Sequence, residues 1–179
     1  MPLRNFEYEI RNGKYVITGV KDFNVKELII PEGVKKIGSY AFANLTALEE
    51  IVLPDSITTL GSRIFSGCTK LTSINLPLNL SSCDHTNYSG PFAESSITEV
   101  TIPKSLTSVG DYGIFSGCTN LTKVIFADGT QKILANILEG AKTVETVIIP
   151  ETVTGIGTDA FRDCKALKEI KLHEIQAPI

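Results

Sequence analysis

Cysteine is the residue of this chain best suited to metal binding or nucleophilic chemistry, and the chain has 4 of them. Cys68, Cys118 and Cys164 share one position of an internal repeat, three residues after a recurring phenylalanine. Consecutive members of this row are two repeat units apart, which is about 10 Å if the units stack as strands ~4.8 Å apart. A disulfide requires Cα atoms within about 7 Å. We therefore expect buried free thiols, and neither disulfides nor a shared zinc ion.

A polar insertion carries the other reactive side chains. The segment 84–91 separates Cys83 from Phe92 with eight residues, where the equivalent segments of the two preceding repeats have four. Its turn-forming residues favour a surface turn with no specific role. The functional alternative is a loop that contacts a partner through His85 and Tyr88, because insertions in repeat arrays often carry binding residues. A metal site from Cys83, His85 and the aspartate between them is disfavoured, since Cys83 fits an inward-facing apolar position.

Motifs of enzyme active sites are missing from the sequence. There is no Gly-x-Ser-x-Gly, no phosphate-binding glycine loop and no His-Glu-x-x-His. Neither His85 nor His173 stands in a motif that would hold it between a nucleophile and an acid. Carboxylates are plentiful, so a glycosidase with paired carboxylates is the enzyme alternative. We expect no catalytic activity, no metal and no cofactor.

Composition excludes two further classes of function. The chain has 17 Lys and Arg against 20 Asp and Glu, for a net charge of −3, whereas nucleic-acid binders need a concentrated basic face. No apolar run approaches the roughly 18–20 residues that span a bilayer. The N-terminal residues have no apolar signal-peptide core, so an export signal is either absent or already removed. We expect neither nucleic-acid binding nor membrane insertion.

The element that must position these side chains is a repeat of about 23 residues. Its clearest mark is a row of prolines, of which the first three are 23 residues apart and one is replaced by alanine: Pro31, Pro54, Pro77, Pro103, Ala127 and Pro150. The position before this row is apolar throughout: Ile30, Leu53, Leu76, Ile102, Phe126, Ile149 and Leu172. A unit of this size cannot bury its own apolar residues, so the pattern predicts a solenoid whose coils stack and share one core.

Each coil is expected to contribute one short strand. In the segment Leu48–Pro54, Ile51 and Leu53 alternate with outward residues, and a proline without an N–H group ends the strand. Stacked strands then form a parallel sheet on one face, and the phenylalanine row fills the back of the coils on short turns or helical segments. Glycines such as Gly61 would permit a tight turn after the strand. The segment Gln131–Glu139 reads as a somewhat longer helical turn.

The repeat resembles a known family. Residues 148–164, which read Ile-Ile-Pro-Glu-Thr-Val and then Ile-Gly-Thr-Asp-Ala-Phe-Arg-Asp-Cys, are similar to the BspA-like leucine-rich repeat pattern, and the resemblance extends over residues 25–179. It implies a leucine-rich-repeat solenoid with an α/β-type, mostly β repeat. It also implies a secreted or cell-surface protein that binds other macromolecules.

The two ends of the chain differ from the repeat. Residues 1–24 contain two alternating apolar runs around Asn12-Gly13, a strong hairpin signal, so we expect an N-terminal β-hairpin that caps the first coil. Residues 25–179 then form the solenoid, with about six coils and an incomplete last one. If the final strand is uncapped, its edge could pair with a second copy and give a weak homodimer.

The outward residues of the sheet are the candidate binding site. We expect the interaction face to comprise Glu27, Ile29, Glu50, Val52, Asn75, Glu99, Thr101, Lys123, Ile125, Ile148 and Lys171. An exposed apolar stripe beside an acidic one is typical of interaction surfaces, although Ile and Val also favour strands for reasons unrelated to binding. The leading hypothesis is a non-catalytic adhesion module that recognises a protein or another cell-surface or extracellular-matrix macromolecule. A structural spacer and a carbohydrate-active enzyme are the alternatives.

Overall fold

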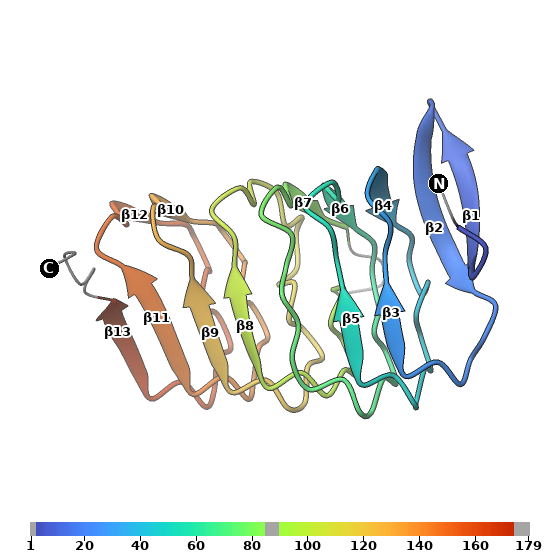
Figure 1. The fold of residues 1–179 in the computed structure, drawn as a ribbon. Coiled ribbons are helices and arrows are strands. Elements are labelled where there is room, and N and C mark those ends of the chain that lie inside the picture. The colour runs from blue at the N-terminus through green and yellow to red at the C-terminus, as the bar shows by residue number, and fades with distance from the viewer. Residues whose placement is uncertain (1–2, 85–89, 174–179) are drawn as a thin grey trace, which may run out of the picture.

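The computed structural model describes residues 3–84 and 90–173, which wind into stacked coils along one axis (Figure 1). This arrangement confirms the predicted solenoid. The side of the coils toward the viewer in Figure 1 carries the front sheet, whose strands are β3 (Glu27–Ile29), β5 (Glu50–Val52), β8 (Glu99–Ile102), β9 (Lys123–Phe126), β11 (Thr146–Pro150) and β13 (Glu169–His173). All pairs within the front sheet are parallel.

A second set of ladders follows the front strands within the coils. It comprises β1 (Phe6–Arg11), β2 (Lys14–Val20), β4 (Val34–Ile37), β6 (Thr59–Leu60), β7 (Ser82–Cys83), β10 (Lys132–Ile133) and β12 (Gly155–Ile156). The first five form one sheet in the order β1-β2-β4-β6-β7, and β10 pairs with β12. These strands begin where we expected only turns. A coil that takes part in both ladders therefore contains a front strand, a bend and a second strand.

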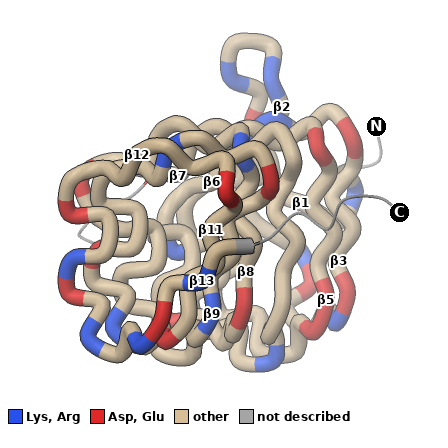
Figure 2. Tube along the Cα trace, turned by 90° about the vertical axis from the view of Figure 1, so that its left-hand side faces the viewer, with Lys and Arg blue, Asp and Glu red and all other residues tan. Residues whose placement is uncertain are grey.

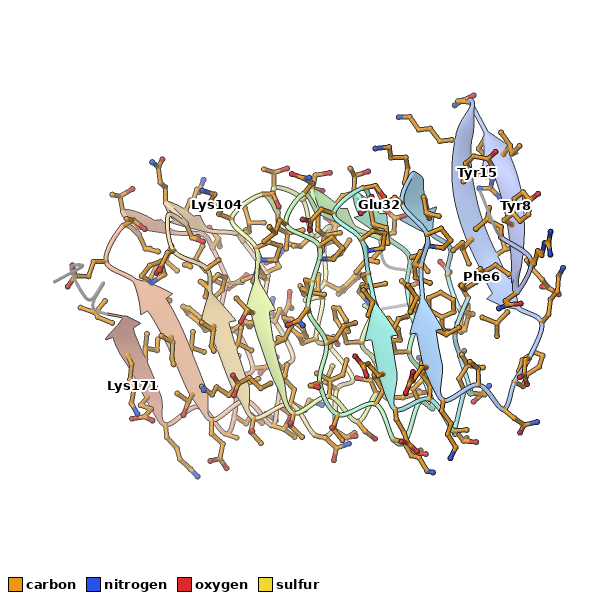
Figure 3. The ribbon with its side chains drawn as sticks, viewed as in Figure 1. Phe6, Tyr8, Tyr15, Glu32, Lys104 and Lys171 are labelled. Carbon is orange, nitrogen blue, oxygen red and sulfur yellow. The ribbon has the colours of Figure 1, made fainter. Side chains whose placement is uncertain are left out.

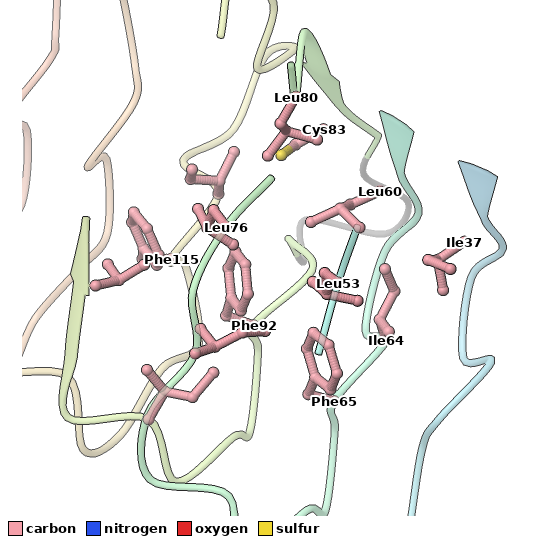
Figure 4. Close-up of a cluster of buried hydrophobic side chains, with 14 of the residues drawn as sticks. Ile37, Leu53, Leu60, Ile64, Phe65, Leu76, Leu80, Cys83, Phe92 and Phe115 are labelled. Carbon is pink, nitrogen blue, oxygen red and sulfur yellow. The ribbon is translucent and has the colours of Figure 1, made fainter. Parts of the chain in front are cut away.

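The core runs through the stack as rows of equivalent residues from successive coils. Phenylalanine rings form one such row: the ring centroids of Phe42 and Phe65 are 6.0 Å apart, those of Phe65 and Phe92 6.0 Å, and those of Phe92 and Phe115 5.3 Å. All four rings are buried. Figure 4 shows Phe65, Phe92 and Phe115 among the aliphatic side chains around them. Apolar burial of this extent is the main force that holds the coils together.

The back of the coils contains no helix among the described residues, so the expected helical turn at Gln131–Glu139 is wrong. Residues 132 and 133 belong to β10, and the chain then continues in turns. Asn136 has φ of 60° and Gly140 has φ of 72°. Left-handed residues at this spacing interrupt a right-handed helix, and they let the coil bend within the length of one repeat.

The front sheet is interrupted in the third coil. Residues 73–76 form no strand, and the only bridge that the described residues make there joins Ser73 to Glu99. Asn75 stands where most other coils have an Ile, Val or Thr, and asparagine is poorly suited to a strand. The front sheet is therefore split into β3-β5 and β8-β9-β11-β13, whereas we expected one continuous sheet.

The N-terminal hairpin covers only part of the first coil. Strands β1 and β2 pair antiparallel around the turn at Asn12, whose φ of 51° is left-handed. Strand β2 then pairs in parallel with β4, which belongs to the second ladder. The hairpin therefore extends that ladder and leaves the outer edge of β3 in the front sheet without a strand partner (Figure 1).

Candidate functional site

The front face is the set of side chains that project outward from the front sheet and from residues 73–75. Strand alternation positions them: Leu28 and Ile51 are buried, while the residues on either side of each are exposed. This face contains all the interaction residues predicted above, from Glu27 and Ile29 at one end to Lys171 at the other. Lys171 projects from β13 in Figure 3.

Apolar exposure is concentrated at the N-terminal end of the front face. Ile29 is 71% exposed and Val52 is 47% exposed, and they lie directly opposite each other on β3 and β5. Ile125 and Ile148 are also in register, but both side chains are half-buried. The predicted apolar stripe is therefore strong over β3-β5 and weaker over β9-β11.

Ion pairs neutralise the C-terminal half of the front face. The Lys123 ammonium lies 3.0 Å from the Glu99 carboxylate on the neighbouring strand. The Lys171 ammonium is 3.0 Å from Glu169, which also accepts a hydrogen bond of 3.1 Å from the Thr146 hydroxyl. The hydrogen bond from Lys171, with that from Thr146, holds the pKa of Glu169 below its ordinary value.

The N-terminal half of the front face is acidic. Glu27 and Glu50 lie directly opposite each other on β3 and β5, and both are exposed. Within the described part of the chain, no ion pair joins either carboxylate to a cation. Like charges in this arrangement repel each other. The front face viewed from the C-terminal end shows acidic positions around β3 and β5 (Figure 2).

A shallow cavity marks the break in the front sheet. It has a volume of about 300 Å³ and lies between residues 49–53 and residues 73–75, with Glu50 and Asn75 among its lining residues. Among the described residues, no backbone hydrogen bond joins these two segments. Asn75, which we expected on a continuous strand, therefore lies at the border of an opening.

Of the insertion at 84–91, only residues 84, 90 and 91 belong to the described part of the chain. His85 and Tyr88, the two predicted loop contacts, lie outside the described residues. Cys83 is buried in the core, as its repeat position predicted. Asp84 forms an ion pair with Lys36 of β4. Among residues 3–84 and 90–173, no group of three metal-ligating side chains is close enough to hold a metal ion.

The cysteines are free thiols, as their spacing predicted. The thiols of Cys68, Cys118 and Cys164 donate hydrogen bonds to the carbonyl oxygens of Phe42, Phe92 and Leu138 respectively, at 3.0, 3.0 and 3.1 Å. Burial raises the thiol pKa to about 11 for Cys68, to about 12 for Cys118 and to about 11 for Cys164. A protonated thiol is a poor nucleophile, and each of these hydrogen bonds joins one coil to the preceding one.

Sequence reasoning missed two polar features. It placed Glu99 and Lys123 on one face but did not pair them, although equivalent positions of adjacent repeats must be neighbours in a parallel ladder. It also missed a network at the back, where Glu94 accepts hydrogen bonds from Arg63 at 2.8 Å and from Ser66 at 2.7 Å. These two bonds, led by that of Ser66, lower the pKa of Glu94. An aligned list of repeat positions would have revealed the first pair.

The chain matches a protein-family model. A family model described as BspA type leucine-rich repeat region matches residues 20–91 and 86–177, in 6 copies. No curated protein matches the chain. The described residues contain no helix long and apolar enough to cross a membrane.

Solved structures share the fold. A leucine-rich repeat protein of T. pallidum superposes with a TM-score of 0.60 at 19% identity, over 93% of this chain and 90% of that protein. A leucine-rich cell surface protein of Faecalibacterium prausnitzii A2-165 gives 0.62 at 24% identity, over 94% of this chain and 53% of that one. The pneumococcal vaccine antigen PcpA gives 0.61 at 16% identity, over 98% and 49%. The chain thus spans about half the length of the last two proteins.

Proposed function

Since the chain belongs to the BspA-type leucine-rich repeat family, we propose that it is a non-catalytic module that binds a macromolecular partner, in the first place a protein, through the N-terminal half of its front face. Repeat proteins of this kind present extended surfaces, and they support interaction without a deep catalytic pocket. We further propose that the chain mediates adhesion at a cell surface. This proposal is supported by the description of the F. prausnitzii neighbour as a cell surface protein.

The exposure of Ile29 and Val52 supports this site most directly. The two side chains form an apolar patch on the two-stranded part of the front sheet, next to the carboxylates of Glu27 and Glu50, which form no ion pair with any described residue. Apolar residues with a charged border are typical of protein-binding surfaces. The equivalent side chains at the other end of the front face are less exposed, and the charges there are already paired.

The proposal is tested by capture of extracellular-matrix and cell-surface proteins on immobilised chain. We expect the double variant Ile29→Ser and Val52→Ser to lose the captured partner, because the apolar patch is removed while the buried core is untouched. The matched control is Tyr8→Ser with Ile10→Ser, which removes two exposed apolar side chains from the hairpin instead. Equal capture by wild type and the front-face variant would reject this site and favour either the insertion with His85 and Tyr88 or a spacer role.

We also propose that residues 1–24 serve as a cap and that residues 25–179 form the binding solenoid of a secreted or cell-surface protein.

A further proposal concerns the outer edge of β13, where Leu172 is 65% exposed. This edge pairs weakly with a second copy of the chain. Light scattering should then show a dimer that disappears with Leu172→Pro, and a strict monomer at high concentration would reject the pairing.

A further inference from the structure

The outer edge of β3 is the open N-terminal edge of the front sheet. On its inner side, the Ile30 amide donates to the Val52 carbonyl, and the Lys26 carbonyl accepts from Glu50. Alternate residues of a parallel strand direct their N–H and C=O groups to opposite edges. The backbone groups of Glu27 and Ile29 therefore face the outer edge, and among the described residues none of them has a backbone partner there.

A cavity lies along this open edge. It has a volume of about 520 Å³, within the range of ligand-binding sites, and it separates β3 from the segment that leads from the hairpin to the first coil. The hairpin supplies Phe6 and Val20 to its lining, and the connecting segment supplies Val25. An extended chain placed beside β3 would thus find backbone groups on one side and apolar side chains on the other.

The charge on β3 indicates which side chains such a segment would carry. In the C-terminal half of the front face, Glu99 is neutralised by Lys123 at the equivalent position of the next strand. A strand added outside β3 would place a residue beside Glu27 in the same relation. Glu27 has only the carboxylate of Glu50 opposite it on the inner side, and Asp22 lines the same cavity. A lysine or arginine in the added strand would complete this column.

We propose that the outer edge of β3 binds an extended segment of a partner protein by strand addition, with an apolar side chain in the cavity lined by Phe6, Val20 and Val25 and a basic side chain beside Glu27. Strand addition uses main-chain hydrogen bonds for affinity and alternate side chains for specificity. The inference rests on the proposed function as a protein-binding module. It differs from it in placing the contact at the edge of the sheet, through the backbone, in addition to the front face.

The probe for this site is a fluorescein-labelled nine-residue peptide of alternating lysine and valine, titrated with the full chain and followed by fluorescence anisotropy. Ile29→Pro removes the outward N–H and leaves the amides that pair with β5. Ile29→Ser keeps the N–H and removes only the exposed side chain. We expect Ile29→Pro to weaken binding about tenfold more than Ile29→Ser does, because both variants lose the isoleucine side chain but only the proline variant loses a backbone hydrogen bond.

Two further measurements keep the test decisive if Ile29→Pro fails to fold. The same peptide with every backbone amide N-methylated cannot donate hydrogen bonds along a strand edge, and it should lose binding to the wild-type chain. A peptide with glutamate in place of lysine should also fail to bind. Binding of the methylated or acidic peptide at wild-type strength, or no binding of the lysine–valine peptide at millimolar concentration, would overturn the proposal.

Failure of this proposal is distinguishable from failure of the proposed function. If partner capture depends on the front face and the peptide does not bind, only strand addition is wrong. If Ile29→Ser weakens peptide binding as much as Ile29→Pro does, the peptide occupies the front face and the edge is not used. If the peptide binds the edge and no partner is captured through the front face, the edge alone is the recognition site.

Discussion

Glu27 and Glu50 face each other across two parallel strands, and no described cation pairs with either, whereas three repeats further along the same column Lys123 neutralises Glu99. The acidic pair therefore destabilises the N-terminal end of the sheet, and proteins often tolerate such a cost where a surface has to bind. The repulsion between Glu27 and Glu50 thus lies on the surface that we propose binds a partner.

The first prediction concerns this acidic pair. Glu50→Lys should raise the free energy of unfolding by about 0.2–1 kcal/mol, because it replaces repulsion with attraction across the strands. Urea denaturation at low salt measures the gain, which should shrink in 1 M NaCl as the charges are screened. The reverse change, Lys123→Glu, creates a second acidic pair and should lower stability. A Glu50→Lys protein that is less stable than wild type at low salt would show that Glu50 has a structural partner.

The second prediction concerns the row of phenylalanine rings. Phe92 is buried between Phe65 and Phe115, so Phe92→Ala should lower the free energy of unfolding by about 3–5 kcal/mol through lost burial and the cavity left behind. Phe23 is 64% exposed, and Phe23→Ala should change stability by less than about 0.5 kcal/mol. Similar losses for the two variants would contradict a shared core that runs through the stack.

The third prediction concerns two glycines in different surroundings. A Cβ atom at Gly61 would lie 2.5 Å from the backbone nitrogen of Ser39 in the preceding coil, so Gly61→Ala should push two coils apart and destabilise the chain strongly. A Cβ atom at Gly155 would meet nothing within 4 Å, so Gly155→Ala should be neutral or stabilise by about 0.4–1 kcal/mol. Thermal unfolding of both variants checks the contrast, and a tolerated Gly61→Ala would refute the close contact between coils.

The fourth prediction concerns the buried thiols at alkaline pH. Because burial raises the pKa of Cys118 from 9.0 to about 12, the unfolded chain loses its thiol proton before the folded chain does. The thiol therefore contributes stability that is complete below pH 9 and is lost as pH rises from there toward 12. Wild type should lose stability more steeply than Cys118→Ala between pH 8.5 and 10.5, in urea titrations with reductant present. Parallel curves would show that Cys118 ionises freely in the folded chain.

Much of the fold followed from rows of residues one repeat apart. The apolar position before each proline predicted the front strands, and the phenylalanine row predicted the stacked rings, because a short repeat must share its core with its neighbours. The second ladder was missed, since strands such as Thr59–Leu60 have two residues and no alternation to detect. The sequence placed Gly61 correctly but for another reason: close contact with Ser39 excludes a side chain there.

The candidate site was only partly predictable. The outward column of the strands gave the members of the front face, but it could not distinguish the exposed Ile29 from the half-buried Ile148, because exposure depends on the neighbours in both adjacent coils. The open edge of β3 depends on which ladder the hairpin extends. That choice is made by the pairing of β2 with β4, and the repeat pattern does not predict it because β2 belongs to the hairpin outside the repeats.

The most direct test of a recognition role for the front face is site-specific photo-crosslinking to the captured partner. A benzophenone side chain at position 52 replaces the exposed Val52 on the front face, and one at position 107 replaces Thr107, which is exposed beside the second ladder. Binding through the front face predicts a covalent adduct with the partner from position 52 and none from position 107. An adduct from position 107 alone would place the partner on the other ladder and contradict the account.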